Sequence, residues 1–290
     1  MTNLVEVIHD SAALYEDIAA SAQYGALYAI VDSAFDLKIN KQLRKWPSIA
    51  LYQNTELADL GPYSPTLYLI GEDDSAAHIA KLLELCKGLP MLSFIRSACN
   101  LAGLKQHLEY LLKVYCEDHT EWPLRYADTR ILVPLFDVLT AEQKNILLGP
   151  IHNWMIPDRF GKIKSQLGEN INTALWCFES GVLKMDEKQF AEMIDAAVPD
   201  SILATVRDKY SSILLPYTSG EQFKRVEQGI KDAKELQLNG DQEILQIALL
   251  QLMAAEGLNQ SADYTVFKKR IHDGQELADA INHLPATFWR

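Results

Sequence analysis

This 290-residue sequence has no long apolar segment, and its first residues do not have the composition expected of a signal peptide. Crossing a bilayer takes roughly 20 consecutive apolar residues, and the nearest candidate, residues 244–255, is interrupted by Gln246 and Gln251. The first ten residues carry Glu6 and Asp10 but no lysine or arginine, so they lack the basic region with which a signal peptide begins. We therefore expect a soluble protein that stays in the cytoplasm, without membrane insertion.

Cysteine is scarce, with four residues spaced widely and unevenly. They are Cys86, Cys99, Cys116 and Cys177. This spacing fits neither a zinc site nor the dense disulfide framework of a small secreted domain. Each cysteine is therefore expected to be a small buried apolar residue. A nucleophilic role for Cys99 or Cys116 is the alternative, but no paired histidine is identifiable for either.

Basic residues are outnumbered in this chain. Lysine and arginine total 27, aspartate and glutamate total 39, and the net charge is −12 at pH 7. The acidic residues are spread along the chain rather than gathered in a tail. Because such a protein repels phosphate backbones, nucleic acid is not expected as a partner.

Short apolar runs separated by helical patterns occupy the first half of the chain. The run Leu-Tyr-Ala-Ile-Val-Asp at residues 27–32 predicts a buried strand. Comparable runs lie at residues 49–52, 66–70, 91–95, 111–115 and 122–126. Between them, residues 76–86 and 101–110 place apolar side chains on one helical face. This alternation predicts an α/β lobe, a mixed sheet flanked by helices, over residues 1–157.

Residues 158–290 show a different pattern, with few β-branched runs and several amphipathic stretches. The stretches begin at the capping residues Asp186, Ser219 and Asp241. Residues 244–255 are apolar nearly all round, which predicts a central buried helix. The second lobe is therefore expected to be all-α.

No familiar catalytic or metal-binding motif is present in the sequence. It has no glycine-rich phosphate loop, no G-x-S-x-G elbow, no H-E-x-x-H and no paired-cysteine motif. The seven histidines sit singly, and His107 and Glu109 are interpreted as solvated helix residues. We therefore expect a protein that is not an enzyme, with no catalytic residue, metal or cofactor.

Polar residues follow several of the predicted strands. They are Asp32, Arg96, Arg125, Asp128 and Arg130. Ligands of open α/β sheets bind at the carboxyl ends of strands, so the placement suggests a ligand site. The favoured interpretation is structural: Asp32 and Asp128 cap the helices that follow them, and nearby arginines pair with these carboxylates.

Large aromatic residues are the other candidates for partner contacts, because such side chains fill pockets in partner surfaces. They are Trp46, Trp154, Trp176, Phe288 and Trp289. Core packing is the commoner fate of such residues, but the Phe288-Trp289 pair lies where chains are usually frayed unless docked. Tyr126, Trp154, Phe288 and Trp289 join the polar residues as candidate partner-binding or lobe-organising positions.

The order of several segments resembles a known family. The first are residues 27–34 (Leu-Tyr-Ala-Ile-Val-Asp-Ser-Ala), 60–63 (Leu-Gly-Pro-Tyr), 66–69 (Thr-Leu-Tyr-Leu), 90–98 (Pro-Met-Leu-Ser-Phe-Ile-Arg-Ser-Ala) and 107–112 (His-Leu-Glu-Tyr-Leu-Leu). The most specific are residues 124–132 (Leu-Arg-Tyr-Ala-Asp-Thr-Arg-Ile-Leu), 139–143 (Leu-Thr-Ala-Glu-Gln) and 148–154 (Leu-Gly-Pro-Ile-His-Asn-Trp). These segments are similar to the type VI secretion effector adaptors, also called effector chaperones. Thr129 departs from the family, which often has proline there, but Asp128 still caps the helix.

This resemblance is strong over residues 27–154 and looser over residues 229–258. It implies a bacterial cytoplasmic adaptor that binds the N-terminal region of a secreted effector toxin and a VgrG-type spike protein, and loads one onto the other. The residues alone leave another function open, an α/β enzyme or small-ligand-binding protein with a site at Asp32, Arg96 and Asp128. A third interpretation is that residues 125–130 only hold the first lobe together.

Overall fold

The chain divides into two units, Met1–Ala196 and Ala197–Arg290. The computed structural model describes residues 3–9, 11–71, 75–168, 182–254 and 261–289. The sequence places the division after residue 157. In the structure it falls after residue 196, because residues beyond 157 complete two sheets of the first unit. Strand β8 (Ile163–Leu167) pairs with β7 (Ile151–Pro157), and β9 (Lys184–Met185) pairs with β5 (Lys113–Cys116).

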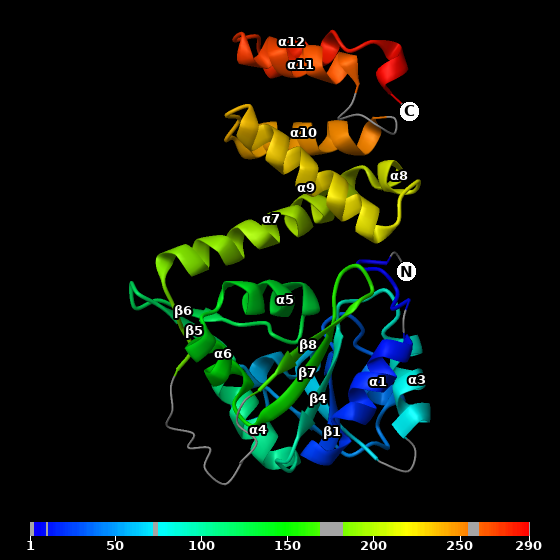
Figure 1. Ribbon diagram of the computed structural model, residues 1–290, viewed down its shortest axis with the longest axis vertical. Helices are drawn as coiled ribbons and strands as arrows, with labels where there is room; N and C mark the ends of the chain where they lie inside the picture. The colour runs from blue at the N-terminus through cyan, green and yellow to red at the C-terminus, as the bar shows by residue number, and fades with distance from the viewer. Residues whose placement is uncertain (1–2, 10, 72–74, 169–181, 255–260, 290) are drawn as a thin grey trace. The chain divides into compact units, whose positions relative to one another are not determined.

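A six-stranded sheet in the order β2-β3-β1-β4-β7-β8 runs through the first unit (Figure 1). Its remaining strands are β1 (Ala26–Asp32), β2 (Ser48–Ala50), β3 (Pro65–Ile70) and β4 (Leu92–Ser97). Each neighbouring pair in this sheet is antiparallel. Successive strands in the sheet therefore end at opposite edges, which decides where the polar residues after each strand lie.

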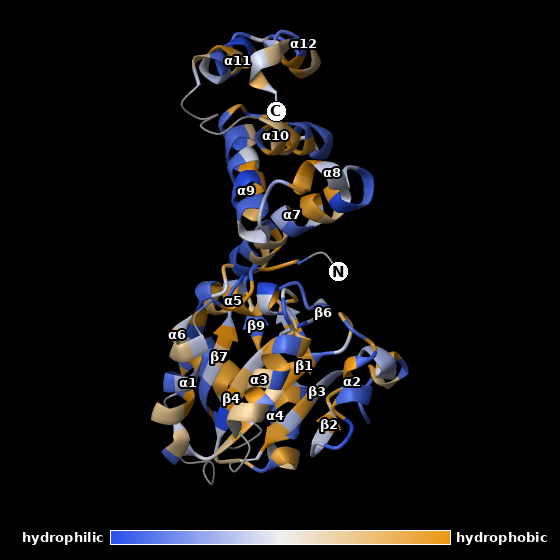
Figure 2. Ribbon diagram, turned by 90° about the vertical axis from the view of Figure 1, so that its right-hand side faces the viewer, coloured by the Kyte–Doolittle hydropathy of each residue, from blue (hydrophilic) through white to orange (hydrophobic). Residues whose placement is uncertain are grey.

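Helices bury both faces of this sheet. One face is covered by α1 (Ser11–Ala20), α2 (Ile39–Gln42) and α3 (Ser75–Leu85), the other by α4 (Leu101–Tyr110), α5 (Thr129–Val138) and α6 (Ala141–Leu148). Side chains alternate along β1, so Leu27, Ala29 and Val31 enter the first core while Tyr28 and Ile30 enter the second. Because both sides are buried, β1 is a continuous apolar run, and Figure 2 shows the apolar residues along the strands.

A smaller sheet in the order β6-β5-β9 lies beside the second core. Strand β6 (Glu121–Pro123) overlaps the apolar run at residues 122–126 that predicts a strand, and ends three residues before it. His119, in the turn between β5 and β6, adopts a φ of 66°. β5 pairs antiparallel with β6 and parallel with β9. The predicted α/β architecture of the first part of the chain is confirmed, with strand pairings of both kinds.

The turn after α6 fixes α4 in place through a glycine. Gly149 has a φ of +50°, and a Cβ there would lie 2.3 Å from the His107 ring. A larger residue would therefore suffer both backbone strain and a clash. His107 is 3% exposed, and its Nε2 lies 3.0 Å from the carbonyl oxygen of Leu147. The expectation that His107 is solvated was wrong, because its position on α4 faces the α6 turn.

The second unit is built from helices, as predicted. They are the second half of α7 (Glu187–Lys209), α8 (Ser211–Leu214), α9 (Ser219–Glu235), α10 (Asp241–Met253), α11 (Ala262–His272) and α12 (Leu277–Asn282). Among the described residues, short 3-10 turns lie at Ala22–Tyr24 and Ala58–Tyr63 in the first unit and at Ala286–Phe288 in the second. The cap of α9 is Thr218 rather than Ser219, because the Thr218 hydroxyl accepts from the Glu221 amide. None of the helices described in either unit is long and apolar enough to span a membrane.

Helices α9 and α10 approach each other closely at one glycine. A Cβ on Gly229 would lie 2.6 Å from the Cα of Ala248. Small residues on both helices therefore allow the two backbones to come into contact. Ile247, Ala248, Leu250 and Leu252 of α10 are buried, in line with the buried helix expected at this position.

Candidate functional site

The end of β1 and the start of α5 bring together four of the five predicted polar residues. Asp32 ends β1 and is 2% exposed, while Asp128 precedes α5 and is 1% exposed. Arg125 donates to Asp32 over 2.9 Å, and Arg130 donates to Asp128 over 2.7 Å. Both guanidinium groups lie over the ring of Phe35, at 5.8 and 5.4 Å from its centroid. We call this group the Asp32–Asp128 corner.

Local sequence explains the shape of this corner. Asp128 is the N-cap of α5, and its carboxylate accepts from the Arg130 amide over 3.0 Å. The amide of Thr129, between Asp128 and Arg130, donates to the carbonyl oxygen of Pro90 over 3.0 Å. This bond ties the start of α5 to the chain leading into β4. Proline has no amide hydrogen, so Thr129, the departure from the adaptor pattern, supplies a bond that proline cannot.

Burial is the main influence on Asp32. It raises the pKa of this carboxyl, and the nearby charge of Asp128 raises it further. The Ala34 amide and the Arg125 guanidinium oppose this rise by stabilising the charged form. The corner thus consists of two carboxylates held by arginines and backbone amides. These contacts attach the start of α5 to the end of β1.

Arg96 lies away from this corner. It pairs with Leu27 across β4 and β1, and Asp32 is five residues further along β1, about 17 Å at ~3.4 Å per residue. Its guanidinium donates to the carbonyl oxygens of Gly25 (3.1 Å) and Ile18 (2.8 Å), on the face covered by α1. The rule about carboxyl ends of strands applies to parallel sheets, and this sheet is antiparallel. The structure therefore does not form the alternative ligand site that includes Arg96.

Tyr126 and Trp154 lie inside the core of the first unit. Tyr126 is 1% exposed and donates to the carbonyl oxygen of Leu108 over 2.9 Å. Trp154 is fully buried, and its indole N–H donates to Ser93 over 3.0 Å. The two rings meet edge to face with centroids 6.1 Å apart. These residues organise the core and present no surface to a partner.

Phe288 and Trp289 lie within the second unit. Phe288 is 4% exposed, with ring centroids 6.4 Å from Tyr264 and 5.0 Å from Trp289. Trp289 forms an isolated β-bridge with Ala254. Phe288 is therefore docked in the hydrophobic core rather than presented to a partner.

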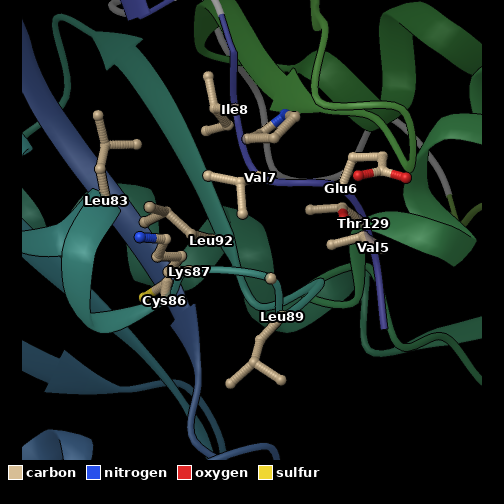
Figure 3. A pocket seen from close by; sticks show the side chains of 12 residues that line it. Val5, Glu6, Val7, Ile8, Leu83, Cys86, Lys87, Leu89, Leu92 and Thr129 are labelled. Atoms are coloured by element: carbon tan, nitrogen blue, oxygen red, sulfur yellow. The ribbon is translucent and has the colours of Figure 1, made fainter. Parts of the chain in front are cut away.

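The segment of residues 3–9 crosses the first unit and covers a small cavity (Figure 3). The Leu4 amide donates to the carbonyl oxygen of Gly88 over 2.8 Å, and the Glu6 amide donates to that of Arg159 over 3.0 Å. Side chains lining the cavity include Val5, Val7, Leu83, Cys86 and Leu92. Its volume of about 60 Å³ is far below the ~300 Å³ at which ligand pockets begin. This cavity is a packing gap under the segment.

Cys86 and Cys99 show no activated thiol. Burial raises the pKa of the Cys86 thiol, and it also raises that of Cys99. A nucleophilic cysteine requires a lowered pKa, so these directions oppose the nucleophile alternative for Cys99. Cys177 lies outside the described residues. The described chain holds no cluster of three or more His, Cys, Asp or Glu side chains able to bind a metal.

A larger cleft lies beside the smaller sheet, where the sequence predicts no site. Its volume is about 370 Å³, and it is lined by residues 54–57, 109, 110, 112, 113, 115 and 182. These residues come from the loop after β2, the end of α4, β5 and the chain before β9. Tyr110 and Val182 at its rim are 52% and 43% exposed. We call it the Lys113 cleft; no single motif predicts it, because its walls are distant in the sequence.

Trp122 is a second exposed feature that the sequence does not single out. It lies on β6, 47% exposed, with its ring centroid 5.3 Å from that of Phe190 on α7. Its cross-strand partner is Val114, so it lies on the opposite face of the sheet from Lys113. The only sequence signal was a tryptophan on a short strand after a polar turn.

Comparison with known proteins identifies one domain. Residues 27–145 match the family model DUF4123, a domain of unknown function. Searches of curated proteins and of solved structures gave no match. The matched residues run from β1 into α6, and include the Asp32–Asp128 corner and all the lining of the Lys113 cleft except Val182. The chain therefore contains a DUF4123 domain at residues 27–145.

Proposed function

We propose that this chain is an effector adaptor of type VI secretion, acting in the bacterial cytoplasm without catalysis. It binds the N-terminal region of a secreted toxin and a VgrG-type spike protein, and loads one onto the other. The observation that carries the proposal is the DUF4123 domain at residues 27–145, because it contains the segments that resemble the adaptor family except the last one, residues 148–154. The exposed cleft and Trp122 within or beside that domain offer surfaces for protein contacts.

The alternative of a small-ligand protein has less support. Its site requires Asp32, Arg96 and Asp128 together, yet Arg96 lies on the other face of the sheet and at its opposite edge. The carboxylates of the Asp32–Asp128 corner are buried as well as bound by Arg125 and Arg130, so they are not accessible to a ligand. We therefore assign the corner a role in holding the domain together.

Co-expression tests the proposal directly. The chain is produced with the products of the neighbouring toxin and spike genes, and complexes are resolved by size-exclusion chromatography. We expect the chain and toxin to co-elute, and deletion of the adaptor gene to abolish toxin delivery. Separate elution together with unchanged delivery would contradict the proposal.

A variant of the corner separates structural from partner-binding roles. The Arg125 side chain is 45% exposed, so Arg125→Ala removes a surface group as well as an ion pair. If the corner only stabilises the domain, the melting temperature of the variant falls slightly. Its affinity for the toxin, measured well below that temperature where the variant is fully folded, is unchanged. Loss of toxin binding without loss of stability would instead place a partner on this corner.

A further inference from the structure

The Lys113 cleft has the dimensions and the lining of a site for a short peptide segment. Its volume of about 370 Å³ lies at the lower end of the ~300–1,000 Å³ range of ligand pockets. Leu112, 6% exposed, gives an apolar floor, while Tyr110 and Val182 remain exposed at the rim. A cleft of this size accommodates one or two side chains of an incoming segment.

The walls of the cleft are held in place by two lysines. The Lys105 ammonium donates to the carbonyl oxygen of Gln53 over 3.1 Å and to Glu109, so it joins α4 to the loop after β2. The Lys113 ammonium contacts Glu56 in the same loop, and Glu121 on β6 over 2.9 Å. Because these bonds fix the walls before a ligand arrives, binding requires little further ordering of the chain.

In each of these ion pairs the carboxylate is the more exposed partner. The Glu56 and Glu121 side chains are 77% and 47% exposed, against 30% for Lys113. Glu109 is 26% exposed, against 10% for Lys105. The hydrogen bonds that the Lys113 ammonium donates to Glu56 and Glu121 raise the pKa of Lys113, so its ammonium stays charged and bound to these carboxylates. A ligand in the cleft therefore meets mainly negative charge.

We infer that the Lys113 cleft binds a peptide segment in which an apolar side chain lies next to a lysine or arginine. The apolar side chain contacts Leu112, Tyr110 and Val182, and the cation pairs with Glu56 or Glu109. The net charge of −12 favours the approach of such a segment. The inference deepens the proposed function and rests on it for the origin of the segment, which belongs to the secreted toxin.

The test uses a fluorescein-labelled synthetic peptide of leucines and lysines at helical spacing, with fluorescence anisotropy as the readout. Glu56→Lys is compared with Glu84→Lys, because Glu84 is also 77% exposed and lies beside a lysine, Lys87. Both variants change the net charge equally. We expect Glu56→Lys to weaken binding about tenfold and Glu84→Lys to leave it within about twofold. Equal weakening by both would overturn the inference in favour of a general effect of the acidic surface.

Further arms test the apolar contact and the sign of the charge. Val182→Asp should weaken binding, whereas Val266→Asp on α11, at a residue of similar exposure (50%), should not. A peptide with glutamate in place of lysine should not bind. Equal binding of this acidic peptide would contradict the inference, and so would an unaltered affinity in Val182→Asp. It would also be contradicted if the wild-type chain associates with itself and the cleft variants do not, because the cleft would then bind a second copy of the chain. Unchanged melting temperatures show that the variants remain folded.

The co-expressed toxin separates this inference from the proposed function. If the wild-type chain retains the toxin and the Glu56→Lys and Val182→Asp variants release it, the result supports both the adaptor function and the cleft as the toxin site. If both variants retain the toxin as tightly as the wild type, the cleft is not the toxin site, but the adaptor function stands. If the wild type never co-elutes with the toxin, the adaptor proposal fails, and the peptide titration alone then decides whether the cleft binds cationic segments.

Discussion

The two units of the chain hold their most deeply buried carboxylates in different surroundings. In the first unit, Asp32 and Asp128 each pair with an arginine. In the second unit, Asp232 is 1% exposed, and its donors among the described residues are neutral. These donors are Gln228 at 3.0 Å, Gln251 at 2.6 Å and the Tyr264 hydroxyl. We call this second group the Asp232 network.

This difference follows from where each carboxylate lies. The Asp32–Asp128 corner is at the edge of a sheet, where Arg125 keeps its side chain 45% exposed and stays partly hydrated. The Asp232 network joins α9, α10 and α11 in the interior, where burying a cation as well would cost several kcal/mol. Neutral donors satisfy the carboxylate there without that cost. The first unit also buries a histidine, His107, so we expect it to respond more strongly to acid.

The largest effect should come from His107. Burial lowers the pKa of this histidine from 6.5 to about 4, so the unfolded chain takes up its proton first as the pH falls. Stability is therefore lost between about pH 6.5 and 4, by about 3 kcal/mol in all. Urea unfolding across this range, compared between the wild type and His107→Gln, measures the loss. An identical pH dependence in both proteins would contradict the assignment.

The next effect on stability is expected at the Asp32–Asp128 corner. Asp128→Ala removes both the cap of α5 and the partner of Arg130, whose side chain is only 18% exposed, and should cost about 3 kcal/mol. Asp186→Ala is the matched control, because Asp186 accepts from the Gln189 amide over 2.7 Å at the start of α7 without an arginine. The control should cost about 1 kcal/mol. Equal losses in chemical denaturation would show that the ion pair adds nothing.

The Asp232 network is tested with a pair of tyrosines. Tyr264→Phe removes a donor to a buried carboxylate and should cost about 2 kcal/mol, whereas Tyr126→Phe removes a donor to the neutral carbonyl of Leu108 and should cost about 1 kcal/mol. Hydrogen exchange measured by mass spectrometry assigns each loss to its own unit. A smaller loss in Tyr264→Phe would mean that Gln228 and Gln251 already satisfy Asp232.

The sequence predicts those parts of the fold that depend on local pattern. The apolar run of β1, the cap at Asp128 and the change to helices after the sheets all follow from neighbouring residues, and the structure contains each of them. The pairing direction of strands is not local. Because β1 and β4 run antiparallel, Arg96 ends at the opposite edge from Asp32, which no spacing along the chain reveals.

The candidate sites show the same limit. His107 is buried because Gly149 leaves room for its ring, and this contact joins residues that are far apart in the sequence. The Lys113 cleft similarly needs the loop after β2, the end of α4 and β5 at once. From the sequence, Glu109 is interpreted only as a solvated helix residue. The relative exposure of the charged side chains in the folded chain is what shows that carboxylates dominate the rim of the cleft.

The smallest effect is expected at Asp32, and its sign is opposite to that of His107. Burial raises the pKa of Asp32, so the unfolded chain loses this proton first as the pH rises above about 3.9. The contribution of Asp32 to stability is therefore present in acid and falls with rising pH until the folded carboxyl also ionises. The stability of Asp32→Asn relative to the wild type should accordingly increase with pH, which urea unfolding in a His107→Gln background measures without the histidine contribution. A decrease instead would mean that Arg125, though 45% exposed, outweighs burial, and the corner would then be electrostatically stabilising, unlike the neutral donors around Asp232.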